Sequence, residues 1–161
     1  MKLSTKGRYG LRALVDLALH GESEAVSISS IAQRQTISER YLEQLMAKLK
    51  KAGIVESIRG PQGGYILSKS PGAITIGDVL RALEGDLNAV DCPVATSTGN
   101  CSSSGLCATK SVWKKINEAI NRAVDDFYLS DLLSEYRQTG MQATVDAQQE
   151  PFKCIGGDDN D

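Results

Sequence analysis

Residues 38–67 read SERYLEQLMAKLKKAGIVESIRGPQGGYIL, and this stretch decides the fold. Its first half repeats apolar residues at intervals of three and four, which predicts the buried face of a helix: Leu42, Leu45, Met46 and Leu49. Ser38 is the expected N-cap of this helix, and Gly53 stands where a left-handed residue commonly follows a helix end.

The second half of the stretch predicts a β-hairpin. Val55–Arg59 reads as a strand and Tyr65–Leu67 as a returning strand. The segment Gly60-Pro61-Gln62-Gly63-Gly64 between them is a strong turn signal. The chain therefore passes directly from an amphipathic helix into a glycine-rich hairpin.

Two helices are predicted before this stretch. The first runs from about Ser4 to Leu19, and a short second one begins at Ser27-Ile28-Ser29-Ser30 and ends near Gln35. The apolar stripe of the first helix is Leu11, Leu14, Val15 and Ala18. Helix, short helix, turn, helix and hairpin is the order of a winged helix-turn-helix. With a further helix over Thr75–Leu83, which has capping-box spacing, we expect a DNA-binding domain over residues 1–84.

The second half of the chain predicts a different organisation. Residues 85–108 read as a loop that holds three of the four cysteines, and residues 109–138 as dimerisation helices. The longest helix is expected from about Thr109 to Tyr128, with a short one over Ser130–Tyr136. Steps of four and three suit a seam between subunits: Val112, Ile116, Ala119, Ala123 and Phe127. Residues 139–161 are polar, and we expect a disordered tail. The predicted fold class is mainly α with a small β-hairpin wing and a long dimerisation helix.

Charge is divided between the halves of the chain. Residues 1–70 carry 11 Lys/Arg and 6 Asp/Glu, whereas residues 71–161 carry 7 and 14. This division suggests that the first half faces a polyanion.

The sequence contains no apolar run of about 18 residues, so no membrane span is predicted. No signal peptide is apparent either, so we expect a cytoplasmic protein. Metalloprotease, C-x-x-C, P-loop and nucleophile-elbow motifs are absent from the sequence, so an enzyme is not expected.

The predicted DNA contacts come from the helix after Ser38 and from the hairpin. The helix directs polar residues outward, toward a major groove that accommodates one helix: Glu39, Arg40, Glu43, Gln44 and Lys48. Arg59 and Gln62 of the hairpin suit the adjacent minor groove. The alternative is that these charges only solvate the surface.

Three segments resemble the iron–sulfur cluster regulator (IscR-like) group of bacterial winged-helix repressors, related to CymR and NsrR. They are MKLSTKGRYG (residues 1–10), SERYLEQL (38–45) and SIRGPQGGY (57–65). The resemblance covers roughly residues 1–138 and implies a homodimeric transcription repressor that binds a palindromic operator. It adds Ser38 and Tyr41 to the expected DNA contacts and implies that an acidic residue at Glu43 tunes which operator class is accepted.

The loop cysteines Cys92, Cys101 and Cys107 suggest a metal site, because thiolates are soft ligands suited to zinc or an iron–sulfur cluster. Spacing alone does not separate the two metals, and three ordinary reduced cysteines are the alternative. The resemblance implies an iron–sulfur cluster, [2Fe–2S] in type. A cluster-free regulator that works as a thiol switch or a cysteine-metabolism repressor is the alternative function.

The sequence does not identify the fourth ligand of the metal site. In the cluster regulators a histidine follows the third cysteine by three residues, and Lys110 stands at that position here. Nitrite-sensitive relatives use an acidic residue near the N-terminus of the partner subunit, where this chain has Arg8. The candidates are His20, Cys154, Asp91 or a group from the partner subunit.

Overall fold

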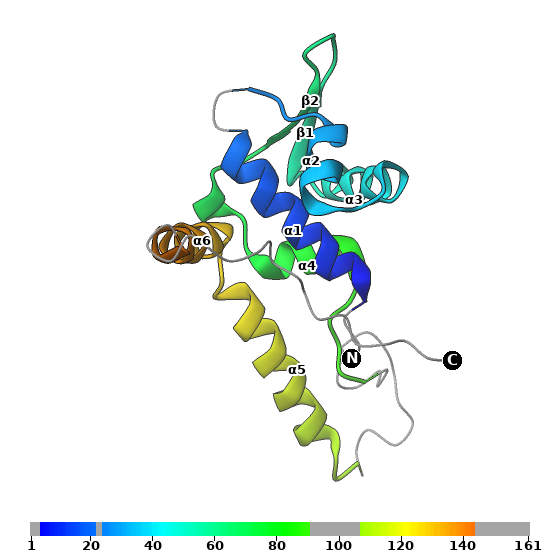
Figure 1. Ribbon diagram of the computed structural model, residues 1–161. Helices are drawn as coiled ribbons and strands as arrows, with labels where there is room; N and C mark the ends of the chain where they lie inside the picture. The colour runs from blue at the N-terminus through cyan, green and yellow to red at the C-terminus, as the bar shows by residue number, and fades with distance from the viewer. Residues whose placement is uncertain (1–3, 22–23, 91–106, 144–161) are drawn as a thin grey trace, which may run out of the picture.

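A computed structural model describes residues 4–21, 24–90 and 107–143, and it confirms the mainly helical fold with a hairpin wing (Figure 1). The elements follow in the order α1 (Thr5–His20), α2 (Ile28–Gln35), α3 (Glu39–Lys51), β1 (Val55–Ile58), β2 (Gly64–Leu67), the 3-10 turn η1 (Pro71–Ala73), α4 (Ile76–Glu84), α5 (Lys110–Asp125) and α6 (Leu129–Ala143). The turn η1 was not predicted from the sequence. In the described residues, no helix is long and apolar enough to cross a membrane.

The first helix, α1, is the central element of the fold. It contacts α2, α3, α4, α6 and β2. The predicted apolar stripe was therefore too narrow: Ala13 and Leu17 are fully buried, whereas Leu11 and Val15 are only half-buried. A helix covered from several sides buries more than one stripe.

Two glycines bring α1 and α4 close together. A Cβ atom added at Gly10 would lie 2.2 Å from a methyl carbon of Leu83, and one added at Gly7 would lie 3.0 Å from the Glu84 carboxylate. Glu84 in turn accepts hydrogen bonds from the amides of Ser4 and Gly7 and from the Ser4 hydroxyl. The carboxyl end of α4 thus caps the amino end of α1, where backbone N–H groups lack partners within the helix.

The hairpin is antiparallel, with Val55 opposite Leu67 and Ile58 opposite Gly64. Its first strand ends at Ile58, one residue before the predicted end. A third backbone segment joins the sheet, because Val26 and Tyr65 exchange both of their N–H···O bonds. A Cβ atom at Gly64 would lie 2.3 Å from the carbonyl oxygen of Val26, so this third segment requires glycine there.

The last two helices take different positions. Figure 1 shows α5 extending away from the winged helix, whereas α6 returns to it. Leu129 and Leu133 of α6 are buried in the core that also holds α1 and α3. Helix α6 is longer than expected, since it continues beyond Tyr136 to Ala143. These two leucines of α6 are thus used within the chain, whereas Tyr136 is 59% exposed, and α5 is the helix predicted to form a dimer seam.

Candidate nucleic-acid interface

Helix α3 is fixed by one buried face and presents another to solvent. Leu42, Leu45, Met46 and Leu49 are at most 2% exposed, as the periodicity predicted. The predicted contact residues of the opposite face are exposed: Ser38, Glu39, Arg40, Glu43 and Gln44. Because the core holds the buried face, these polar side chains form a solvent-facing ridge of the kind that enters a major groove.

The start of α3 is anchored on α1. Tyr41 is half-buried, its hydroxyl lies 3.3 Å from that of Thr5, and its ring meets the ring of Tyr9 edge-on. Ser38 occupies the N-cap position, as predicted, and its carbonyl accepts from the amides of Tyr41 and Leu42. Its hydroxyl makes no capping bond, which leaves that group at the exposed end of the helix.

An ion pair, which was not predicted from the sequence, positions α2. The Asp16 side chain is 2% exposed and accepts hydrogen bonds from Arg34 and Gln35 of α2. Arg12 of α1 also donates to the backbone carbonyl of Gln35. The signal in the sequence was an acidic residue next to the buried positions of an apolar helix. These bonds tie α1 to the segment that precedes the turn into α3.

That turn contains a strained residue. Thr36 has φ 55° and ψ 47°, in the left-handed region that β-branched residues rarely adopt. Its amide and that of Ile37 bond back to carbonyls of α2. The turn between α2 and α3 is therefore held by backbone hydrogen bonds, and the Asp16 pair holds α2 itself on α1.

The wing presents the two predicted minor-groove residues. Arg59 and Gln62 are both exposed at the hairpin tip, where Gly60 has φ 125° and Gly63 donates to the Gly60 carbonyl. Lys50 of α3 donates to the hydroxyl of Ser57 in β1. This bond links the recognition helix to the wing.

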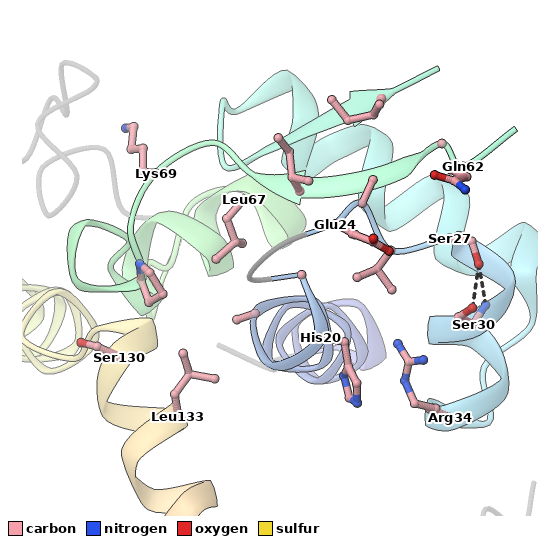
Figure 2. A pocket seen from close by; sticks show the side chains of 18 of the residues that line it. His20, Glu24, Ser27, Ser30, Arg34, Gln62, Leu67, Lys69, Ser130 and Leu133 are labelled. Atoms are coloured by element: carbon pink, nitrogen blue, oxygen red, sulfur yellow. Dashed lines mark hydrogen bonds between the residues drawn. The ribbon is translucent and has the colours of Figure 1, made fainter. Parts of the chain in front are cut away.

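A groove of about 1170 Å³ lies beside the wing (Figure 2). Gln62 borders it near Ser27 and Ser30 at the start of α2, and His20 and Arg34 lie side by side on another rim. The described residues that line it include no Phe, Tyr or Trp. This fits the low aromatic content and differs from the apolar, aromatic lining typical of small-molecule pockets.

Lys48 differs from the other predicted contact residues. Its ammonium group donates to the carbonyl oxygen of Leu83, near the end of α4, at 2.9 Å. The Lys48 side chain is therefore directed toward α4 rather than outward with Arg40 and Gln44.

Of the predicted metal ligands, only Cys107 lies in the described residues, together with the candidate His20. Cys92, Cys101, Asp91 and Cys154 lie outside them. The pKa of the Cys107 thiol is lowered by a hydrogen bond from the Thr109 hydroxyl, with help from nearby amides and the charge of Lys110. A thiol that ionises readily fits the thiolate chemistry of zinc and iron–sulfur sites. Among the described side chains, no group of three His, Cys, Asp or Glu residues could hold a metal ion.

His20 and Lys110 take other roles within one chain. The Nδ1 atom of His20 lies 2.8 Å from the carbonyl oxygen of Asp16, at the carboxyl end of α1 beside the wing (Figure 2). Helix α5, which Cys107 precedes, begins at the opposite end of the molecule (Figure 1). Lys110 acts on the thiol through its charge and its amide.

Helix α5 is attached to α4 by polar contacts. Arg81 donates to both carboxylate oxygens of Asp125, which lowers the pKa of Asp125, and also to the side chain of Asn121. Asn117 is buried and accepts from the amide of Ala89. The other face remains apolar, with Val112 50% exposed and Ile116 37% exposed.

An outward polar helix held on a winged-helix core defines a class of protein: a DNA-binding transcription regulator. The family model for Rrf2, described as an iron-dependent transcriptional regulator, matches residues 3–135. The chain belongs to the Rrf2 family, whose members are regulators rather than enzymes.

Named relatives agree with this assignment. The chain is 36% identical over 150 residues to the HTH-type transcriptional regulator IscR of Salmonella paratyphi B, covering 91% of this chain and 90% of that protein. The structure of CymR, the global cysteine regulator of B. subtilis, matches with a TM-score of 0.69 and 41% identity, over 84% of this chain and 98% of the other. The structure of T. potens IscR matches with a TM-score of 0.67 and 45% identity, over 86% and 90%.

Proposed function

We propose that this regulator is a homodimeric repressor that binds a palindromic operator and responds to iron–sulfur or redox status. The observation that carries the DNA-binding part is the exposed ridge of α3 beside an exposed arginine at the wing. In this proposal the contact residues are Ser38, Glu39, Arg40, Tyr41, Glu43 and Gln44 in the major groove, with Arg59 and Gln62 at the minor groove.

The proposed dimer uses the exposed apolar face of α5. Val112 and Ile116 lie one helical turn apart on it, and Phe127, which follows the helix, is 46% exposed. Exposed apolar side chains along one side of a helix commonly mark a protein interface. A two-fold axis along this face would set the spacing of two α3 helices, which is what a palindromic operator requires.

The proposed sensor is an iron–sulfur cluster, [2Fe–2S] in type, held by Cys92, Cys101 and Cys107. Such a cluster supplies one-electron redox chemistry when bound. The support in this chain is the lowered pKa of Cys107 and its position directly before α5. Lys110 favours the thiolate form of Cys107 by its charge.

The first experiment is purification without oxygen, followed by an absorption spectrum and iron and sulfide analysis. We expect visible absorbance with iron and sulfide in equal amounts, and its loss in a Cys107→Ala variant. A Cys154→Ala variant tests one candidate for the fourth ligand: absorbance that is kept excludes Cys154 as a ligand, whereas absorbance that is lost supports it. A colourless protein without iron and sulfide contradicts the cluster.

A cluster-free thiol switch is the second candidate, favoured by the lowered pKa of the Cys107 thiol and by the likeness to CymR. It predicts operator binding that depends on a dithiol reductant and not on iron. The same anaerobic preparation distinguishes the two, because an operator mobility shift can be repeated after iron removal.

A further inference from the structure

The contact between Lys48 and Leu83 joins the recognition helix to a helix end. Helix α4 ends at Glu84, so the carbonyl of Leu83 has no partner in a following turn of the helix. A cation at the carboxyl end of a helix also meets the negative end of its dipole. The Lys48 ammonium therefore acts as a C-terminal cap of α4, supplied from α3.

The same end of α4 is held by two other elements. Glu84 is bonded to the amino end of α1, and Arg81 is bonded to Asp125 of α5. Residues 85–90 continue from this end toward the cysteine segment; Leu87 among them is buried, and the Ala89 amide is held by Asn117 of α5. The Lys48 hydrogen bond thus adds to the packing of α3 against α4, and the end of α4 leads on to the segment before the cysteines.

Lys48 differs from the polar residues of α3 that are proposed to contact DNA. In helix-turn-helix complexes the amino-terminal residues of the recognition helix contact the base edges. Lys48 lies in the last turn of α3, and its ammonium is already bonded within the chain. Arg40, Gln44 and Lys48 are all exposed, so Lys48 is distinguished by its position near the end of α3 and by its hydrogen bond to Leu83, not by burial.

We propose that Lys48 is a positioning residue rather than a DNA contact: it fixes α3 on the carboxyl end of α4 and so links the recognition helix to residues 85–90. The positioning role of Lys48 is independent of any cofactor. We add that the state of the cysteines reaches α3 through this link, and this addition rests on the proposed sensing function.

The first test measures affinity for the operator and for an unrelated duplex at several salt concentrations. Lys48→Met keeps the aliphatic stem and removes the charge. We expect it to weaken operator binding about threefold to tenfold, the order of one ordinary intramolecular hydrogen bond, because Lys48 is exposed to solvent. Affinity for the unrelated duplex and the slope of log K against log salt should be unchanged, and Lys48→Arg should restore operator binding.

Two control variants are needed to interpret this result. Arg40→Gln removes a proposed contact and should reduce the salt slope by about one, whereas Lys114→Met removes a charge on α5 and should change neither affinity. If Lys48→Met reduces the salt slope like Arg40→Gln and weakens both duplexes equally, Lys48 contacts phosphate and the proposal is wrong. Unchanged operator affinity also overturns it. Equal loss on both duplexes at constant slope, with a lowered melting temperature, indicates unfolding and likewise overturns it.

The second test compares operator affinity of the iron-loaded protein with that of a variant in which Cys92, Cys101 and Cys107 are alanine. The ratio of these affinities should fall toward one when Lys48→Met is added to both. A ratio that stays at the parent value overturns the link. If the parent ratio is itself one, the proposed sensing function fails, and the salt and duplex measurements still decide the positioning role.

Discussion

Arg34 of α2 donates to both oxygens of the Asp16 carboxylate of α1, and the Asp16 side chain is 2% exposed. Removing one partner of a buried ion pair leaves the other without its charge compensation. Because about a third of Arg34 is exposed, we expect Asp16→Asn to lower the free energy of unfolding by about 2 kcal/mol, below the usual range for fully buried pairs. Urea denaturation measures this; Asp126→Asn, at an exposed position, should change it little, and an equal loss in both variants contradicts the prediction.

Gly10→Ala tests the close approach of α1 and α4. In an exposed helix this change stabilises by about 1 kcal/mol. Here the new methyl group would overlap Leu83, so we expect a loss of about 1–3 kcal/mol, the usual cost of overpacking a core. Thermal denaturation gives the sign. Gly72→Ala is the control, because its nearest neighbouring atom lies 3.9 Å away and stability should barely change. A rise in stability for Gly10→Ala would show that α4 moves freely.

Glu84 predicts a pH dependence. Burial alone would raise its pKa, but hydrogen bonds from Ser4 and the Gly7 amide hold the pKa below its ordinary value. A carboxyl whose pKa is lower in the folded state adds stability above its unfolded pKa of about 4.3, and that stability is lost as the pH falls through the folded pKa. The difference in unfolding free energy between the parent and Glu84→Gln should therefore be constant near neutral pH and shrink below about pH 4.3. A difference that grows in acid refutes this reading.

Arg59→Ala tests the wing. We expect operator affinity to fall by about 1–3 kcal/mol, with relaxed sequence preference at the positions where the wing inserts. Gel-shift titrations with the operator and with variants at those positions measure both effects. Lys114→Gln removes an equal charge from the distant helix α5, and its affinity should match the parent. If the two variants behave alike, the wing does not read the groove.

Ile116→Glu tests the α5 face. A carboxylate placed in an apolar seam carries a large desolvation cost, so the proposed dimer should dissociate to monomers in analytical ultracentrifugation, and operator affinity should fall with it. Glu118→Lys reverses a charge at an exposed position two residues along the helix and should leave the mass unchanged. A dimeric Ile116→Glu protein places the interface elsewhere.

The local elements of this fold could be predicted from the sequence because their signals are local. The period of Leu42, Leu45, Met46 and Leu49 and the glycine-rich turn before Tyr65 determine a helix and a hairpin within a few residues of each other. The proposed DNA-facing residues then follow from which face of that helix is left polar.

The contacts that hold these elements together could not be predicted in the same way. Asp16 finds Arg34 18 residues later, and Glu84 finds Ser4 80 residues earlier. Lys48 looked like a member of the outward face because helical period gives the direction of a Cβ atom, whereas a long side chain can turn toward a carbonyl of a neighbouring helix. The length of α6 was also missed, since its buried leucines, Leu129 and Leu133, lie in its first turns and residues 134–139 are exposed.

The close seam between α1 and α4 has a consequence for how this chain can diverge. Gly7 and Gly10 on one helix face Leu80, Leu83 and Glu84 on the other at distances that leave no room for a methyl group at position 10. A larger residue at position 10 becomes acceptable only when position 83 becomes smaller. Positions 10 and 83 should therefore covary among homologous sequences, because a change in the size of one side chain requires a change in the other.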